Sequence, residues 1–276
     1  MTAGGAVLAG RVAVVTGATG GIGSAICRRL AENGAAVVAG FRRDENAARA
    51  LVSSLAAVTA NQHSAIHVDV TDASALESFA GQISARYGRA DILVNAVGTT
   101  RFVSHADLDR LDDDLIDEIF RTNWRGPFAT IRALRPLLEK GVEKGVREPF
   151  SGGLQENGSR TPFSALVVNI SSVAAVTGVG SNVAYCASKA ALNAMTMALA
   201  RALAPAIRVV SVSPGVVETE FIKGLDERWR EEQRKRTPLG RLASPADVAD
   251  AVLAAATTLQ SATGCVIPID GGRPLA

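Results

Sequence analysis

This chain of 276 residues has few cysteines and few aromatic residues, and it carries no large excess of charge of either sign. The cysteines, Cys27, Cys186 and Cys265, are odd in number and lack the spacing of metal ligands, which argues against a disulfide framework and a zinc site. The 29 basic and 27 acidic residues nearly cancel, so no strong field would draw the chain to nucleic acid or to an anionic membrane. We therefore expect a small-molecule partner and a reducing, cytoplasmic location.

Long apolar runs and targeting signals are also missing. No apolar run is long enough to span a bilayer, and the stretch 1–21 has no basic region before its apolar residues and its glycines. We therefore expect neither a membrane anchor nor a removable signal peptide. The three histidines, His63, His67 and His105, are scattered, so no metal site is expected.

Most of the chain alternates between apolar segments typical of buried strands and segments with helical periodicity. Residues 11–43 are typical of a strand, a glycine-rich turn, a helix and a second strand. The alternation continues to the end of the chain: helix 47–55, strand 65–70, helix 75–87, strand 91–97, a helix leading to Asn123, helix 128–138, strand 165–171, a helix holding Tyr185, strand 207–215 and strand 265–272. This order predicts an α/β fold, a single-domain Rossmann-type doubly wound parallel sheet with helices on both faces over 1–276.

One segment departs from this alternation. Residues 140–163 are polar and glycine-rich, and they lie where a handful of residues would join a helix to a strand. We interpret them as a long surface loop, an insertion that the fold tolerates or, alternatively, a binding segment.

The first strand-to-helix junction carries Thr16, Gly17, Gly21 and Gly23 in a T-G-x-x-x-G-x-G pattern. Residues without side chains let backbone N–H groups approach a pyrophosphate at the positive end of a helix. Gly17 would make the turn and Gly23 would let helix and strand pack closely. A tight turn with no ligand is the alternative.

The end of the second strand reads Gly40, Phe41, Arg42, Arg43. A carboxylate at this point would bind the ribose 2′-hydroxyl of NAD, but two guanidiniums stand there and suit a 2′-phosphate. This favours NADPH/NADP+ as the cofactor. Alternatively the arginines only solvate the strand end. Asp44 is expected to cap the next helix with either cofactor.

Asp69 and Asn95 are expected at the carboxyl ends of the third and fourth strands, where ligands of such sheets bind. Each alone is typical of a turn. Together they resemble an adenine pocket.

Tyr185, one of only two tyrosines, precedes Lys189 by four residues, so on a helix both heads share one face. A nearby ammonium stabilises a phenolate, and we expect it to lower the pKa of Tyr185 and suit it for general acid catalysis. Ser172, which we expect at the end of a strand, would hold the substrate oxygen. The alternative is a core tyrosine beside a solvated lysine.

These residues resemble the short-chain dehydrogenase/reductase family, and the resemblance runs from Arg11 to Gly272. "TGATGGIG" resembles the family's glycine motif, "VNAVG" its Asn-Ala-Gly motif, Ser172 with "YCASK" its catalytic signature, and "SPGVVET" its Pro-Gly stretch. The resemblance implies a catalytic tetrad of Asn123, Ser172, Tyr185 and Lys189, in which Asn123 holds a water that links the lysine to solvent. Taken with the patterns above, it implies cofactor contacts from Gly17, Thr19, Gly20, Gly21, Ile22, Gly23, Phe41, Arg42, Arg43, Asp69, Val70, Asn95, Ala96, Gly98, Tyr185, Lys189, Pro214, Gly215, Val217 and Thr219.

Three features depart from the family pattern. Val97 interrupts the Asn-Ala-Gly motif before Gly98, Ser211 replaces an asparagine, and the 140–163 loop is long. The first two remove no group from the tetrad, whereas the loop makes closer relatives a poor guide to the substrate. Residues 218–241 resemble the family's substrate lid, with an apolar face at Phe221, Ile222, Leu225 and Trp229 that covers substrate or packs on the core.

The resemblance implies an NADPH-dependent ketoreductase of the EC 1.1.1 type, similar to 3-oxoacyl-carrier-protein reductases, with a carbonyl substrate. Alcohol oxidation, with NADP or NAD, uses the same residues in reverse, and a dinucleotide sensor without turnover is the alternative outside enzymes. The resemblance also implies a homo-oligomer, a tetramer, packed through the helices after the fourth and fifth strands and through the C-terminal segments.

Overall fold

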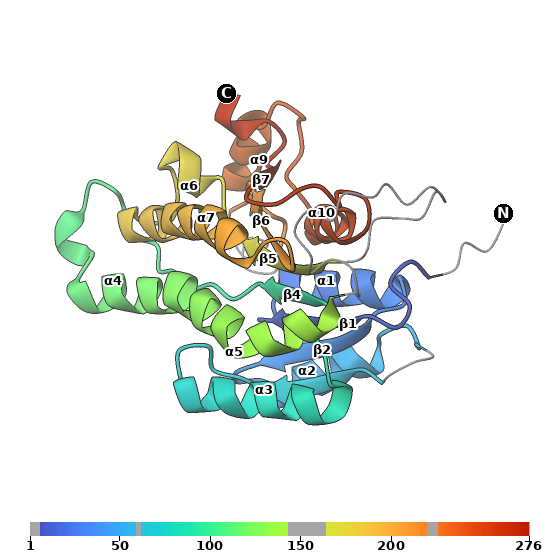
Figure 1. Ribbon diagram of the computed structural model, residues 1–276. Coiled ribbons are helices and arrows are strands. Elements are labelled where there is room, and N and C mark those ends of the chain that lie inside the picture. The colour runs from blue at the N-terminus through green and yellow to red at the C-terminus, as the bar shows by residue number, and fades with distance from the viewer. Residues whose placement is uncertain (1–5, 59–61, 143–163, 220–225, 276) are drawn as a thin grey trace.

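The computed structural model describes residues 6–58, 62–142, 164–219 and 226–275. Within them, one parallel sheet of seven strands has the order β3-β2-β1-β4-β5-β6-β7 (Figure 1). The strands are β1 (Val12–Thr16), β2 (Ala36–Phe41), β3 (Ser64–His67), β4 (Ile92–Asn95), β5 (Ala165–Ile170), β6 (Ile207–Pro214) and β7 (Val266–Ile269).

Helices cover both faces of this sheet (Figure 1). The α-helices are α1 (Gly21–Glu32), α2 (Glu45–Ser53), α3 (Ala73–Tyr87), α4 (Asp113–Phe120), α5 (Gly126–Gly141), α6 (Ala174–Thr177), α7 (Val183–Leu203), α9 (Glu227–Lys235) and α10 (Pro245–Thr257). Shorter turns are η1 (Leu108–Arg110), η2 (Arg121–Arg125) and η3 (Arg273–Leu275).

The strands are buried on both faces because alternate side chains belong to two separate cores. Val15, Val94 and Val168 pack with α1, α2 and α10 on one face. Val14 and Leu93 pack with α3, α5 and α7 on the other. The predicted doubly wound α/β fold is confirmed, since period-2 alternation between two apolar layers produces the nearly continuous apolar strands seen in the sequence.

The strand order reverses beside β1, which pairs with β2 on one side and β4 on the other. The chain leaves β1 and β4 toward opposite faces of the sheet, so their carboxyl ends diverge and leave a crevice. That crevice holds the site described below.

Several predicted boundaries need correction. The strand predicted over 65–70 ends at His67, so Asp69 lies two residues beyond it. Ser172 likewise lies two residues after β5 rather than at its end. Helix α5 runs to Gly141, so the segment predicted as a loop from residue 140 begins in a helix, and residues 143–163 lie outside the described part. The predicted lid contains α9, while Phe221, Ile222 and Leu225 lie outside the described residues.

In the described residues no helix is long and apolar enough to cross a membrane. No group of three or more His, Cys, Asp or Glu side chains lies together there in a way that suits a metal ion.

Candidate active site

The turn between β1 and α1 is shaped by two glycines. Gly17 has φ +69°, and a Cβ there would lie 2.9 Å from the carbonyl oxygen of Ala96 at the end of β4. A Cβ on Gly23 would lie 2.2 Å from the carbonyl oxygen of Gly17. Any side chain would therefore push the turn away from β4 or the helix away from the turn. The cap residue of α1, Gly20, makes no side-chain hydrogen bond, which leaves the helix N-terminus open toward the crevice.

A cavity of about 240 Å³ lies beside this turn. It is lined by Gly17, Thr19, Phe41, Arg42, Arg43, Asp44, Val68, Val70, Val97, Gly98, Thr99 and Thr122. Asp44 also caps α2, accepting a hydrogen bond of 2.8 Å from the N–H of Ala47, as predicted. Two guanidiniums and an open helix N-terminus therefore lie at the same cavity or beside it.

Asp69 and Asn95, predicted to share an adenine pocket, do not line this cavity. The carboxylate of Asp69 accepts hydrogen bonds from the N–H and hydroxyl of Thr71, at 2.9 and 2.7 Å, and lies 4.0 Å from Arg42. Burial raises the pKa of Asp69, but these hydrogen bonds outweigh burial and leave the pKa below its ordinary value. Asn95 is 1% exposed and bonds to Asn169 under the helix layer. Asn95 thus turns into the protein, whereas Asp69 closes a local turn with Thr71 and its side chain stays 31% exposed. Their shared adenine pocket stays a prediction.

A second cavity, of about 430 Å³, continues from the first, since both are lined by Val97, Gly98 and Thr99. Its lining residues are Ile22, Ala96, Val97, Gly98, Thr99, Thr100, Ile170, Ser171, Tyr185 and Lys189. The two cavities form one groove across the carboxyl end of the sheet. The arginine pair lies at one end and the Tyr185–Lys189 pair at the other.

Helix α7 carries Tyr185 and Lys189 on one face, as their spacing predicts. Asn182 caps the helix and accepts a hydrogen bond of 2.7 Å from the N–H of Tyr185, which fixes the first turn. The ammonium of Lys189 lies 5.9 Å from the centre of the Tyr185 ring and donates a 2.8 Å hydrogen bond to the carbonyl of Ile170. Ser172 approaches from β5 and shares a side-chain hydrogen bond with Tyr185.

The ionisation of this pair differs from the sequence-based expectation. Burial raises the pKa of Tyr185 above its ordinary value, although the hydrogen bond with Ser172 acts to lower it. Burial also lowers the pKa of Lys189 from 10.5 to about 8. The expected lowering of the tyrosine pKa is therefore wrong for the protein alone, because loss of water around both heads outweighs their attraction.

We expect the lowered pKa of the buried Lys189 to make the free energy of unfolding depend on pH. Between about pH 8 and 10.5 the unfolded chain keeps a proton on Lys189 that the folded chain has released, so stability rises with pH in this window. The full rise is about 3 kcal/mol. Denaturant unfolding of wild type and of Lys189→Met at a series of pH values measures this rise as the difference between their free energies of unfolding. A difference that stays flat or falls between pH 8 and 10 would contradict a buried, easily deprotonated lysine.

Asn123 lies where the helix between α4 and α5 opens. Over Arg121–Arg125 the chain makes a π turn, and the N–H of Gly126 reaches the carbonyl of Arg121, five residues back. The side chain of Asn123 is 0% exposed. Its oxygen accepts from the N–H of Thr99 at 2.8 Å, and its NH₂ donates to the Thr99 carbonyl at 3.0 Å and to the Ser188 hydroxyl at 3.1 Å. The amide therefore ties the loop after β4 to α7.

The Pro214–Thr219 stretch runs from the end of β6 to the N-terminus of α1. The N–H of Gly215 donates to the carbonyl of Ile269 at 3.0 Å, and a Cβ on Gly215 would meet the backbone of Asp270 at 3.0 Å. The methyl of Thr219 lies over Gly21, where an added Cβ would approach it to 3.0 Å. Val217 forms a bridge with Ala243. The stretch is thus held from both sides at the open end of α1.

The loops after β4 and β5 are joined by a clasp that the sequence analysis missed. The hydroxyls of Thr100 and Ser181 are 2.5 Å apart, and the Asn182 amide donates to Thr100 at 3.2 Å and to the carbonyl of Arg101 at 2.7 Å. The N–H of Val103 donates to the carbonyl of Ser181 at 2.9 Å. No motif identifies these contacts, since the partners lie about eighty residues apart; only the polar residues before Tyr185 hint at them.

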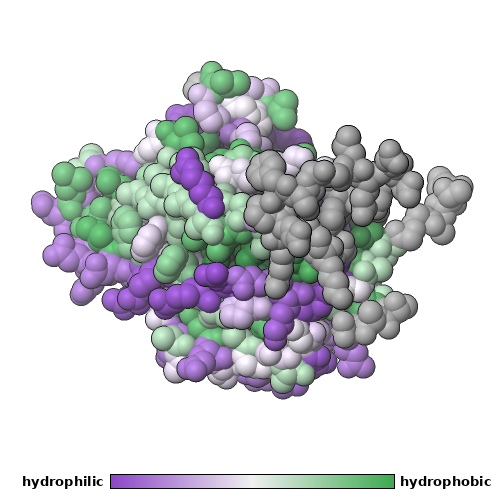
Figure 2. Space-filling model, in the orientation of Figure 1, coloured by the Kyte–Doolittle hydropathy of each residue, from purple (hydrophilic) through white to green (hydrophobic). Residues whose placement is uncertain are grey.

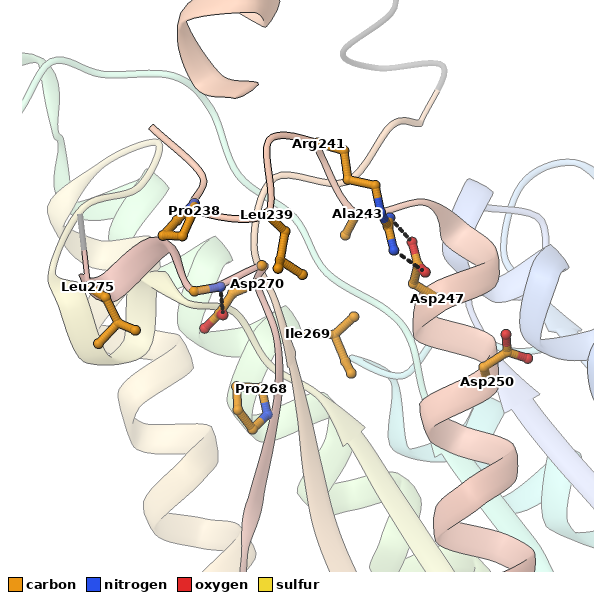
Figure 3. Close-up of a pocket in the computed structure, with 12 residues that line it drawn as sticks. Pro238, Leu239, Arg241, Ala243, Asp247, Asp250, Pro268, Ile269, Asp270 and Leu275 are labelled. Atoms are coloured by element: carbon orange, nitrogen blue, oxygen red, sulfur yellow. Dashed lines mark hydrogen bonds and ion pairs between the residues drawn. The ribbon is translucent and has the colours of Figure 1, made fainter. Parts of the chain in front are cut away.

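A separate cavity of about 550 Å³ lies beside the end of β7 (Figure 3). Leu239, Ile269 and Leu275 line it, and its charged pair, Arg241 with Asp247, is closed by hydrogen bonds of 2.7 and 3.0 Å. It lacks all four residues of the predicted tetrad. The chemistry of the molecule is therefore expected in the groove, not here.

Comparisons with known proteins bear on the whole chain. A family model described as short chain dehydrogenase matches residues 11–146, and one described as enoyl-(acyl carrier protein) reductase matches residues 154–273. The chain is 35% identical to a 3-oxoacyl-(acyl-carrier-protein) reductase of Thermotoga maritima, over 96% of this chain and 98% of the relative. It is 32% identical to cis-4-hydroxycyclohexanecarboxylate dehydrogenase of Sinomonas cyclohexanicum, over 97% and 98%.

Solved structures agree with these sequence matches. A short-chain dehydrogenase/reductase of Brucella melitensis, described as a glucose/ribitol dehydrogenase, matches with a TM-score of 0.81 and 27% identity. The match covers 96% of this chain and 97% of that one.

Proposed function

Because the chain belongs to the short-chain dehydrogenase/reductase family of oxidoreductases, we propose that it reduces a carbonyl substrate with NADPH, in the groove between Arg42 and Tyr185. The observation that carries the proposal is the pairing of a protonated Tyr185 with a buried Lys189 at one end of a groove whose other end holds two arginines. The 3-oxoacyl-(acyl-carrier-protein) reductase among the relatives favours reduction of a ketone.

The residues of the groove fit a nicotinamide dinucleotide. The side-chain-free turn at Gly17 and the uncapped N-terminus of α1 suit the pyrophosphate. Arg42 and Arg43 would hold a 2′-phosphate, and Ile22, which lines the cavity of Tyr185, would contact the nicotinamide end together with Pro214, Gly215 and Thr219. When bound, this cofactor supplies the hydride that a carbonyl carbon accepts.

Tyr185 would donate the proton to the carbonyl oxygen, and Ser172 would hold that oxygen by a hydrogen bond. The raised pKa of Tyr185 keeps its proton in place at neutral pH but makes the phenol a weaker acid, so the ammonium of Lys189 would stabilise the phenolate as the proton leaves. Lys189, with a pKa of about 8, is poised to return a proton to Tyr185 after transfer. Asn123 would keep the proton path at Lys189 open through the π turn, and would place the water that the family resemblance implies.

Turnover with a panel of ketones tests this function. The protein is incubated with NADPH and ketones that include 3-oxoacyl thioesters, and cofactor absorbance is followed. Consumption of NADPH that depends on the ketone is expected. Turnover only with alcohols and oxidised cofactor would favour the reverse reaction, as in the cyclohexanecarboxylate dehydrogenase, and tight cofactor binding with no turnover would favour a sensor.

The choice of cofactor is tested at the arginine pair. Replacing both Arg42 and Arg43 with alanine is expected to raise the Kd of NADPH about tenfold to a hundredfold, since the lost charge-assisted bonds are worth about 1.5–3 kcal/mol, while NADH binding changes little. Fluorescence titration measures both cofactors. Arg49→Ala, an exposed arginine of α2 paired with Glu45, serves as the control. Equal weakening of both cofactors, or a wild type that prefers NADH, would make the NADPH assignment wrong.

A homo-oligomer, specifically a tetramer, is also proposed. The helices after β4 and β5 present a shallow apolar surface that is lined by Phe120, Trp124, Phe128, Ala191, Ala194, Met195, Ala198 and Leu199. Trp124 stacks on Phe128 with ring centres 6.1 Å apart, and Figure 2 shows hydrophobic residues gathered over α7 on this face. Burial of this surface against another copy would remove it from water.

Trp124→Glu is expected to reduce the sedimentation coefficient relative to wild type, because it places a charge on that apolar surface. Sedimentation velocity at working concentration measures the change. A wild-type protein that already sediments as a monomer would contradict the tetramer.

A further inference from the structure

Three polar side chains lie side by side across the middle of the sheet, under the helix layer of α7. Asn95 of β4 pairs in register with Asn169 of β5, and Asn169 pairs with Ser211 of β6. All three are at most 1% exposed. Thr196 of α7, also 0% exposed, meets this row from above. Buried polar groups need hydrogen-bond partners. These residues bond to one another, and only the side-chain oxygen of Asn95, within this row, is left without a partner.

The donors and acceptors among Asn95, Asn169, Ser211 and Thr196 can be assigned from the hydrogen bonds that they make. The Thr196 hydroxyl donates to the carbonyl of Leu192 at 3.0 Å, which uses its single proton. It must therefore accept from the Asn169 NH₂ at 2.9 Å and from the Ser211 hydroxyl at 2.8 Å. The oxygen of Asn169 then accepts from the Asn95 NH₂ at 2.9 Å. Through Thr196, α7 is thus hydrogen-bonded to side chains of both β5 and β6.

The same helix carries the reacting pair. Thr196 follows Lys189 by seven residues, two helical turns, so both lie on the face that meets the sheet. A second polar contact, from the Ser171 hydroxyl to the backbone carbonyl of Lys189 at 3.3 Å, lies between them. At the N-terminal part of α7, Ser188 accepts a hydrogen bond from Asn123 and Asn182 donates to the loop after β4, so these contacts hold the helix to loops and to the π turn rather than to the strands. The hydrogen bonds at Thr196 add a directed contact to two strands, two turns beyond Lys189.

We propose that Thr196 is a positioning residue for Tyr185 and Lys189, acting with Asn169 and Ser211 to fix the position of α7 on the sheet. The inference rests on the proposed reduction at Tyr185. Ser211 was noted as a departure from the family's asparagine, and here its short hydroxyl is the group that reaches Thr196. A displacement of about 1 Å at a reacting group costs up to about a hundredfold in rate, so a small slide of α7 has a large effect.

The test compares Thr196→Val, which keeps the shape but removes the hydroxyl, with Thr196→Ser, which keeps the hydroxyl. Thr196→Val is expected to lower kcat about tenfold to a hundredfold with KM for NADPH little changed, and Thr196→Ser to restore kcat. Thr257→Val is the control, because the Thr257 hydroxyl donates to the carbonyl four residues back in α10 at 2.8 Å, on the other face of the sheet. If Thr196→Val fails to fold, Ser211→Ala removes one of the two donors and takes its place. A folded variant of either kind with wild-type kcat overturns the proposal.

A second readout separates this inference from the proposed function. Tyr87 and Tyr185 are the chain's only tyrosines, so in a Tyr87→Phe background the ultraviolet titration of tyrosinate reports Tyr185 alone. If the wild type turns over no ketone, the proposed function fails, and this titration still tests Thr196. Thr196→Val is then expected to move the Tyr185 titration, and Thr196→Ser to return it. An unmoved titration in that case overturns the positioning role.

Discussion

Replacing Tyr185 with phenylalanine is expected to lower kcat about a thousandfold or more while NADPH still binds with nearly wild-type affinity. The change removes only a hydroxyl from the end of the groove, and that hydroxyl is the proposed source of the transferred proton. The groove keeps its shape because the ring stays, and the arginine end lies in the neighbouring cavity. Steady-state kinetics with a reducible ketone, together with cofactor titration, separates the two effects.

Tyr87→Phe is the matched control for this substitution. The Tyr87 hydroxyl has structural partners at the edge of the sheet away from the groove: it donates to the carbonyl of Gln62 at 2.7 Å, which uses its single proton, and so accepts from the hydroxyl of Ser64 at 2.8 Å. Its loss is expected to lower stability and leave kcat unchanged. Activity of Tyr185→Phe within a few fold of wild type would rule out Tyr185 as the acid.

Asn123→Leu is expected to lower kcat about a hundredfold and also to destabilise the fold. The family resemblance alone predicts a modest change in Tm, but the structure shows the amide making three hydrogen bonds at 0% exposure. A leucine leaves the N–H and carbonyl of Thr99 without partners, which costs about 1–3 kcal/mol for each group that stays dry. Kinetics must therefore be measured well below the melting temperature, with the folded fraction established by circular dichroism.

Ser188→Ala provides the comparison for Asn123. It removes one of the three contacts while the π turn and the Thr99 contacts remain, so we expect a small loss of stability and nearly unchanged kcat. If Asn123→Leu melts early but turns over normally while folded, Asn123 is structural and the active site is a triad.

The sequence predicts those parts of the site that depend on local spacing. The pairing of Tyr185 with Lys189 follows from a four-residue interval, and the arginine end of the groove follows from the last residues of a strand. The helix boundaries near Asp44 are equally local, because a cap and its N–H partner lie three residues apart. The doubly wound sheet follows from the alternation of apolar strands and helices.

Other features depend on partners far along the chain, and the sequence did not predict them. Asn95 lies at the end of its strand as expected, but its side chain turns inward because of Asn169, 74 residues away. The pKa of Tyr185 was predicted from its charged neighbour alone. Desolvation decides its direction, and desolvation is set by everything that packs around the hydroxyl.

The clasp between the loops after β4 and β5 has a consequence for altering substrate range. Loop exchange between relatives normally treats each loop as an independent module. Here Asn182 both caps the helix of Tyr185 and holds the opposite loop through Arg101 and Thr100, so exchanging the first loop alone would disturb the helix as well. Libraries that transplant residues 99–105 and 180–182 together from one donor are expected to yield more active members than libraries that transplant either segment singly, with activity scored on the same ketone panel.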